Sequence, residues 1–534
     1  MSYSIILDEK LKDIYFRGID RKVVAVTNNG GRILYSQSCN EIYEIRKYIR
    51  ESESLLNGDL FGKSLQAESI SKKELNKIFS EFEDNKVEEV EEIELEEKKG
   101  EYALKLRGIL EKCANDGCSD IHIEVYESKT IFFQRINGDR HEINSVPENQ
   151  LGLNLAAYIF FHKADEKDED FFKKRINNGK FEEILKINGI ERNTQWRVSW
   201  MPSNEGGKIA LRWLNKEEKV GSLTDLGWPK SYVKVVQDFV KHGSGALFVS
   251  GKVGSGKSTT LASIMENIDP SLSRHSFEDP PEFRLVGVVQ TQVRPNVKVS
   301  DGSDEYQDQA YFAKGGLRQD IDVELYGETR EKAGASQVGR KSETGQLVLS
   351  SIHTSGASGI PSTLVEHLEL SPSLVSSPDF LKLLVYQALV KSLCSCALPF
   401  NEWKNCDEVE VSEVRHAETT LNELIKEGKV GESIFESCRF KNPNGCEMCE
   451  SRGEKDRLPL IELIVVDDED REFWFKRDFI GWKKHLIEKG FSDISYHGAR
   501  RVESGEVDLF TAEKRIGRFV KESTQSVYEG LKHD

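Results

Sequence analysis

The chain lacks any apolar run of the roughly 20 residues that a helix needs to cross a bilayer. Its first residues, MSYSIILDEKLKD, carry no basic stretch, and their apolar part is too short for a signal peptide. Positive charge is also scarce, since 74 Lys and Arg face 91 Asp and Glu and the net charge is −17. Nucleic-acid binders need a basic footprint. We therefore expect a cytoplasmic protein without a transmembrane segment and without a nucleic-acid partner.

Cysteine is rare as well, with nine residues in 534, but six of the nine fall between Cys394 and Cys449. In a cytosolic chain such clustering favours metal binding over disulfides. Cys113 and Cys118 stand apart, and we expect them to be buried thiols. A chain of 534 residues is too long to fold around one ordinary hydrophobic core. Its content of 38% hydrophobic and 31% charged residues is typical of several soluble folded units.

The order of patterns along the chain predicts α/β folds in several domains. Residues 80–101 are dominated by glutamate, whose mutual repulsion favours a solvated linker. Strand and helix patterns alternate over 223–392, which predicts a parallel sheet covered by helices, with ligands at the carboxyl ends of its strands. The expected divisions are an N-terminal domain of unknown role (1–80), an acidic linker (81–102), a smaller α/β domain (103–222), a parallel-sheet α/β domain (223–392), a cysteine-rich insert (393–455) and a helical C-terminal region (456–534).

One motif carries strong chemistry: Gly251-Lys-Val-Gly-Ser-Gly-Lys-Ser258 follows a predicted strand and precedes a predicted helix. It fits the P-loop pattern, in which glycines let backbone N–H groups surround phosphate oxygens and the helix adds its positive dipole end. Lys257 would neutralise the β- and γ-phosphates, and the Ser258 hydroxyl would coordinate Mg²⁺. The residues expected to bind MgATP are Gly251, Gly254, Ser255, Gly256, Lys257, Ser258 and Thr259.

Three further segments follow in a fixed order: Phe277-Glu-Asp-Pro-Pro-Glu-Phe283, the stretch from Leu317 to Arg330, and the stretch from Thr344 to Thr354. With the P-loop, they resemble the aspartate box, the Walker B segment and the histidine box of the secretion ATPase superfamily. That family comprises the motors of type II secretion and type IV pili, with relatives in type IV secretion. The resemblance spans about residues 103–520 and implies a RecA-like motor domain preceded by a smaller PAS-like α/β domain.

The resemblance also implies roles for individual residues. Glu278 and Glu328 match the family's aspartate-box and Walker B glutamates, which would position the attacking water near Mg²⁺. His353 matches the histidine-box residue, which would sense the nucleotide. Arg197 and Arg212 match arginines that reach the phosphates when the smaller domain closes on the motor. Forked guanidinium groups suit that task.

Two positions depart from the family pattern. Gln346 stands where the family usually has histidine, and Glu324 lies in a predicted central strand, where a carboxylate needs a partner. These departures leave a nucleotide-dependent regulator of weak catalytic activity as an alternative to a motor.

Family members of the secretion and pilus-extension branches commonly carry two CxxC pairs that hold zinc. Here Cys446 and Cys449 form one pair, and Cys394 and Cys396 form a pair that is one residue short. Since zinc needs four ligands, Cys438 or Cys406 could instead complete the set. Reduced thiols without metal are the alternative.

As a whole, the resemblance implies a homo-hexameric ATPase that powers type IV pilus assembly or type II-like secretion through an inner-membrane platform protein. A conjugative or type IV secretion ATPase is the nearest alternative, and a helicase-like motor is disfavoured by the acidic charge. We further expect residues 1–80 to recruit the motor to its membrane complex.

Overall fold

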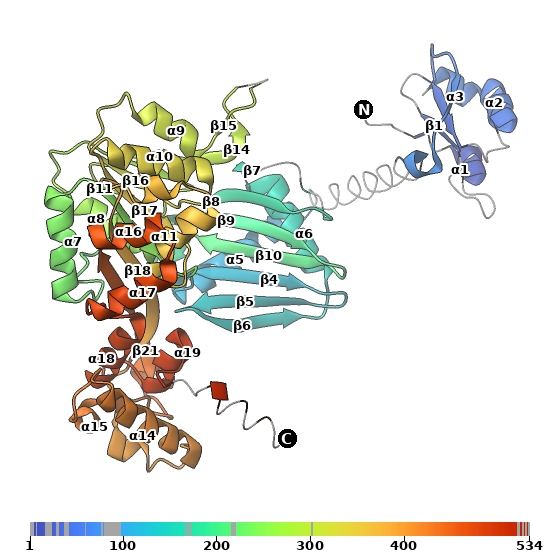
Figure 1. Ribbon diagram of the computed structural model, residues 1–534. Coiled ribbons are helices and arrows are strands. Elements are labelled where there is room, and N and C mark those ends of the chain that lie inside the picture. Colours follow the sequence, from blue (N-terminus) through green and yellow to red (C-terminus); the bar gives the residue numbers. More distant parts are fainter. Residues whose placement is uncertain are drawn as a thin grey trace. The chain divides into compact units, whose positions relative to one another are not determined.

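The computed structural model describes residues 5–6, 8–15, 24–27, 31–36, 42–58, 60–75, 78, 98–164, 166–167, 171, 173–214, 220–300, 303–520, 524–525, 528 and 531 (Figure 1). Two compact units are distinguished, one of residues 1–110 with 150–162 and one of residues 111–149 with 163–534. Most of the expected acidic linker lies outside the described residues, and its last residues begin helix α5 (Lys99–Asn115).

The N-terminal part of the first unit is a small α/β fold around a three-stranded sheet. Tyr15 is buried in its core, where its hydroxyl donates to the Ile6 carbonyl at 3.0 Å and accepts from the Val26 N–H at 3.0 Å. The elements are α1 (Glu9–Tyr15), β1 (Val24–Thr27), β2 (Arg32–Tyr35), α2 (Ile42–Glu51), α3 (Glu53–Asn57) and β3 (Gln66–Ser69). The same unit contains α6 (Gln150–Tyr158).

The second unit opens with an antiparallel sheet in the order β6-β5-β4-β10-β9-β8-β7. Its residues alternate, as in Ile121 and Ile123, which are buried, and His122, which is not. One face is therefore apolar and includes Trp196 and Trp200, while the other carries polar side chains. The strands are β4 (Asp120–Val125), β5 (Thr130–Ile136), β6 (Asp139–Val146), β7 (Glu166–Lys167), β8 (Asn177–Ile187), β9 (Ile190–Pro202) and β10 (Gly207–Trp213).

The second sheet of this unit has the order β13-β12-β16-β17-β11-β18-β21, and all neighbouring pairs except β18–β21 are parallel. The predicted parallel sheet is thus present. Its strands are β11 (Gly245–Ser250), β12 (Arg274–Glu278), β13 (Val289–Gln292), β16 (Val323–Tyr326), β17 (Leu347–Ile352), β18 (Leu381–Leu393) and β21 (Glu454–Val465). The sequence predicted a helical region from residue 456, but β21 comes first because Leu460, Ile461 and Ile464 are buried in this sheet.

Helices cover both faces of the parallel sheet, because successive strand residues point to opposite sides. Leu247 and Val249 pack in one hydrophobic cluster with α7 (Lys230–His242) and α8 (Lys257–Glu266). Phe248 packs in a second cluster with α10 (Lys332–Glu343), α16 (Asp468–Phe475) and α17 (Phe479–Glu488). Further elements of this region are β14 (Arg294–Lys298), β15 (Tyr306–Gln307), α9 (Gln309–Gly316), α11 (Ile360–Ser362) and α12 (Pro372–Val375).

Glu324 does have the partner that its buried strand position requires. Its side chain is 0% exposed and lies 2.6 Å from the Lys341 Nζ, which is 1% exposed. The Tyr326 hydroxyl donates to the other carboxylate oxygen at 2.5 Å. This acidic departure from an apolar strand is therefore a compensated interior pair.

The cysteine-rich module lies between β18 and β21, at whose ends Leu393 and Glu454 are paired. A hydrophobic core that includes Phe400, Trp403 and Phe440 joins it to the two last helices. The elements here are β19 (Leu398–Pro399), α13 (Phe400–Trp403), α14 (Val411–Lys426), α15 (Ile434–Ser437), β20 (Arg439–Phe440), α18 (Ile494–Glu503) and α19 (Leu509–Ile516). Among the described residues, no helix combines the length and apolar character needed to traverse a membrane.

Candidate functional site

The predicted phosphate loop connects β11 to α8, as the motif requires. A Cβ on Gly251 would lie 2.4 Å from the Gln387 carbonyl oxygen, and Gly256 has a φ of 84°, so both positions need glycine. The Lys257 Nζ donates to the Gly251 carbonyl at 3.0 Å. Burial lowers the pKa of Lys257, while the charges of Glu328 and Glu282 oppose that shift. The loop thus holds an ammonium group whose burial favours the approach of an anion.

Gln387 on β18 braces this loop and was missed from the sequence. Its side-chain N–H₂ donates to the Ser255 carbonyl at 2.7 Å, and its carbonyl accepts from the Thr260 hydroxyl at 2.8 Å. The residue is 3% exposed. Both bonds join a strand that is 127 or more residues distant in sequence to the start of α8, so no local pattern could indicate the contact.

Glu278 ends β12 at the carboxyl edge of the sheet, close to the segment that carries Glu328. A Cβ on Gly327 would meet the Glu278 Cα at 3.3 Å. Burial raises the pKa of Glu278. Hydrogen bonds from Ser276 at 2.6 Å and Gln290 at 3.3 Å lower this pKa and so partly oppose the effect of burial. This carboxyl group is therefore desolvated, which is typical of groups that handle protons.

Glu328 and His353 meet beside the phosphate loop. The His353 Nε2 lies 3.2 Å from Glu328, and its Nδ1 lies 2.9 Å from the Gly251 carbonyl oxygen. Both contacts are hydrogen bonds when both ring nitrogens carry protons, since both partners are acceptors. Burial favours a higher pKa for Glu328, but the ion pair with Arg330 at 2.7 Å and the charges of His353 and Lys257 lower it. The structure thus places Glu328, His353 and Lys257 around one loop.

The two predicted arginines face each other in the antiparallel sheet but have different surroundings. Arg212 pairs in register with Arg197 on one side and Asp120 on the other. The Arg212 Nε donates to Asp120 at 2.8 Å, which leaves its terminal nitrogens for another acceptor. Both side chains are exposed, but only Arg212 lines the cavity described next.

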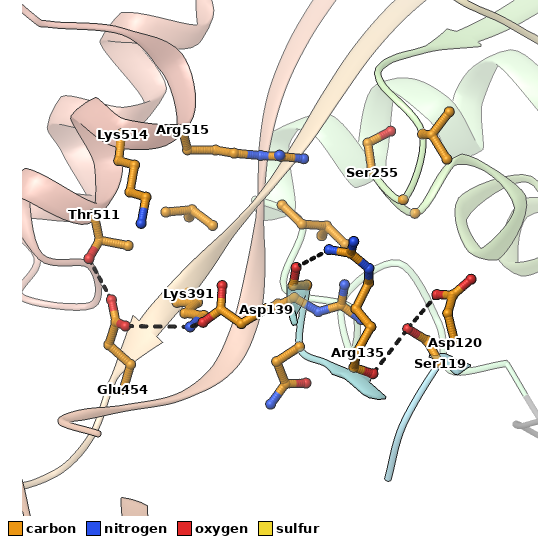
Figure 2. Close-up of a pocket in the computed structure, with 18 of the residues that line it drawn as sticks. Ser119, Asp120, Arg135, Asp139, Ser255, Lys391, Glu454, Thr511, Lys514 and Arg515 are labelled. Atoms are coloured by element: carbon orange, nitrogen blue, oxygen red, sulfur yellow. Dashed lines mark hydrogen bonds and ion pairs between the residues drawn. The ribbon is translucent and has the colours of Figure 1, made fainter. Parts of the chain in front are cut away.

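A cavity of about 1150 Å³ lies between the phosphate loop, the antiparallel sheet and the C-terminal helix α19 (Figure 2). Residues 253–259 form one wall, and Ser119, Asp120, Arg135 and Arg212 form another. Glu278, Glu328 and His353 are not among its lining residues.

A third wall of the cavity consists of residues that the sequence did not single out. Asp139, at the tip of the β5–β6 hairpin, forms an ion pair with Lys391 of β18, and the Asn137 side chain donates to the Lys455 carbonyl at 3.2 Å. Glu454 lies 3.8 Å from Lys391 and accepts from the Thr511 hydroxyl at 2.5 Å.

The four predicted metal ligands come together. One ligand atom from each of Cys394, Cys396, Cys446 and Cys449 lies within 4.8 Å of all the others. Three sulfur pairs are separated by 3.7, 3.9 and 3.7 Å, close to the edge of about 3.8 Å of a tetrahedron with Zn–S bonds near 2.3 Å. Burial favours a neutral Cys449, but N–H groups of Cys446 and Gly453 lower its pKa to about 6.

The two alternative ligands lie elsewhere. Cys438 is buried in the hydrophobic core with Phe400 and Phe440, and burial raises its pKa to about 11. Cys406 is directed to the Glu402 carbonyl instead. Cys113 and Cys118 are buried thiols, as predicted.

Gln346 donates to the Ile321 carbonyl at 2.6 Å. It lies just before the first residue of β17, whereas His353 follows the last residue of that strand.

Comparisons with known proteins agree with this geometry. Residues 96–518 match the family model "Type II/IV secretion system protein". The chain is 33% identical over 370 residues to the type II secretion system protein E of Dickeya dadantii, covering 68% of this chain and 65% of that one. It is 31% identical to the Pseudomonas aeruginosa protein of the same name, covering 72% and 70%. The type IV pilus assembly ATPase PilB of Thermus thermophilus is 27% identical, covering 75% and 41%.

Among solved structures, the Legionella pneumophila ATPase DotB resembles this chain with a TM-score of 0.51 and 17% identity, covering 77% of this chain and 95% of that one. That likeness concerns the fold alone. The match to the Dickeya protein spans just under two thirds of that relative's length.

Proposed function

The chain belongs to the type II/IV secretion system protein family, and from this premise we propose that it is an ATP-hydrolysing motor of type II secretion or type IV pilus assembly. The observation that carries the proposal is the grouping of Lys257, Glu328 and His353 around the Gly251 end of one phosphate loop. The names of its relatives, type II secretion system protein E and PilB, support the cellular role.

In the proposed reaction, the loop N–H groups and Lys257 hold the phosphates of ATP, and Gln387 fixes the loop in the receptive conformation. Gly251, Gly254 and Gly256 keep Cβ atoms out of that cradle, while Ser255 and Thr259 complete its lining. The Ser258 hydroxyl would hold Mg²⁺, which neutralises charge on the transferring phosphoryl group.

Hydrolysis needs a group that orients the attacking water. Glu328 is suited to this because ion pairing with Arg330 keeps it ionised beside the loop. Glu278, more deeply desolvated, would position the same water from the neighbouring strand. His353 bridges the Gly251 carbonyl and Glu328, and so would couple the state of the loop to that of the carboxylate.

The arginines of the antiparallel sheet would neutralise the phosphates from the opposite wall. Asp120 accepts a hydrogen bond from the Arg212 Nε, so the two terminal nitrogens of Arg212 remain available to phosphate oxygens. Arg197, its exposed neighbour, would join only after the sheet moves relative to the loop. Closure on nucleotide and reopening after hydrolysis would then convert turnover into motion.

We extend the proposal to the assembly. Six copies would form a ring at the cytoplasmic side of the inner membrane and act on a platform protein, with residues 1–80 as the recruiting domain. The four-cysteine cluster would bind zinc, since its sulfur spacing fits a tetrahedral site and its chemistry is that of structural zinc sites. Bound zinc would tie the two ends of the cysteine-rich module together.

The test is ATP turnover by the full chain, beside Lys257→Ala and Glu328→Gln, with light scattering on the same samples. Turnover lost in both variants, with nucleotide binding retained in Glu328→Gln, is the expected result. Nucleotide binding without turnover in the wild type, even with the membrane partner added, would identify a regulator and refute the motor. The compensated Glu324–Lys341 pair removes one reason for that alternative.

A further inference from the structure

The C-terminal helix α19 places two cations in the wall of the cavity that also contains the phosphate loop. Lys514 and Arg515 occupy its last turn, and both line the cavity. Figure 2 shows the Arg515 side chain extended across the cavity toward the side on which Ser255 lies. The helix belongs to the region after the cysteine-rich module, to which no chemistry has been assigned so far.

Three other cations that line the cavity, Lys391, Lys441 and Lys514, lie near carboxylates. Lys391 is paired with Asp139 and lies 3.8 Å from Glu454, and Lys441 lies 3.8 Å from the same Glu454 oxygen. Lys514 faces the charge of Asp139. In contrast, Arg515 is half-buried and has no carboxylate partner within the part of the chain that the structure describes.

A half-buried guanidinium without a counter-charge favours an anionic ligand. Its fork fits phosphate oxygens better than a point charge does. The phosphate loop on the facing wall is also suited to phosphate groups, so one nucleotide can contact both the loop and Arg515. Arg515 lines this cavity, whereas Glu278, Glu328 and His353 do not, which favours a contact of Arg515 with the part of the ligand away from the bond that is hydrolysed.

We propose that Arg515 is a nucleotide-binding residue that contacts the α-phosphate side of the nucleotide and strengthens the binding of ATP and ADP equally. The inference rests on the proposed ATPase function. An interaction of equal strength with substrate and product changes affinity and leaves the chemical step unaltered. A cation that only capped the end of α19 would instead affect helix stability.

The experiment compares the full-length wild type with Arg515→Ala, Arg515→Lys and Arg518→Ala. Arg518 is exposed, lies three residues further on and does not line the cavity, so it serves as the matched control. Calorimetric titration with ADP and with a non-hydrolysable ATP analogue measures both affinities, and steady-state turnover gives kcat and KM. Thermal unfolding checks that each variant is folded.

The expected result is a loss of about tenfold in affinity for both nucleotides in Arg515→Ala, the size of one charge-assisted hydrogen bond at a half-exposed site. The kcat stays unchanged, Arg515→Lys recovers part of the affinity, and Arg518→Ala equals the wild type.

Unchanged affinities in Arg515→Ala would overturn the proposal, as would a lower melting temperature with intact affinity, which indicates a helix cap. A lower kcat with intact ADP affinity would move the contact to the γ-phosphate and also overturn it. The proposed function fails separately, if wild-type nucleotide binding is absent or does not depend on Lys257.

Discussion

Replacing Lys341 by Met tests how the motor sheet tolerates an acidic residue in a central strand. The Glu324 side chain is fully buried, and its contacts are the Lys341 ammonium at 2.6 Å and the Tyr326 hydroxyl at 2.5 Å. In Lys341→Met the carboxylate keeps the hydroxyl but loses its counter-charge. Removing one member of a buried pair costs about 3–5 kcal/mol of stability.

For a domain of this size, each kcal/mol lowers the melting temperature by about 2–4 °C, so the expected shift is about 6–20 °C downward. Because the chain has several domains, it can show several unfolding transitions. The relevant transition is the one whose midpoint temperature rises when ADP is added, because a ligand stabilises only the domain that binds it. Differential scanning calorimetry with and without ADP identifies that transition.

Replacing the whole group tests the reasoning further. In Glu324→Leu/Tyr326→Phe/Lys341→Met no interior polar group is left without a partner, so most of the lost stability should return. A shift of less than about 3 °C in Lys341→Met would refute the claim that the pair is desolvated. Failure of the triple variant to recover would show that packing, and not the unpaired charge, accounts for the loss.

Four other predictions follow from the site. Gln387→Leu should raise the KM for ATP about tenfold by releasing the phosphate loop, while Gln346→Leu, an amide at the opposite end of the sheet, leaves KM unchanged in the same turnover assay. Because burial raises the pKa of Glu278 and the Ser276 hydrogen bond lowers it, activity should fall with decreasing pH already above the range of an ordinary carboxyl group. Ser276→Ala should move that acidic limb of kcat/KM to still higher pH, and a limb that does not move would contradict the assignment. Arg212→Ala should reduce kcat/KM more than Arg197→Ala, since only Arg212 lines the cavity; equal losses would show that both arginines reach the nucleotide. Purified protein should contain one zinc per chain by elemental analysis, and Cys449→Ser should contain none, with Cys406→Ser as the matched control that keeps it.

Local patterns were sufficient for most of the fold. The central strand predicted to contain Glu324 is present as β16, and the phosphate loop lies between the strand and the helix that its motif requires. Cys396 was placed with Cys446 and Cys449 despite its short spacing, and the sulfur atoms do converge. These predictions were possible because the sequence patterns of glycine loops and of paired cysteine ligands are contained within a few residues.

What the sequence did not reveal depends on contacts between distant segments. The sequence predicted a helical region from residue 456, but strand β21 forms there by pairing with β18, a contact that no local pattern reveals. Gln387, Asp139 and Arg515 have no local pattern of their own. Each gains its role from a neighbour far along the chain, such as Ser255 for Gln387 and Lys391 for Asp139.

The register of β18 with β21 has a consequence for how this family varies. Since Leu393 and Glu454 are adjacent across the ladder, everything from residue 394 to residue 453 is, in topological terms, an oversized loop at the end of a hairpin. Each doubling of such a connection costs only about 0.6 kcal/mol in closure entropy, and this one has a hydrophobic core to offset it. Insertions and deletions at this point therefore leave the strand order of the motor unchanged, and a chain without the cysteines would need only a short turn to close the same sheet.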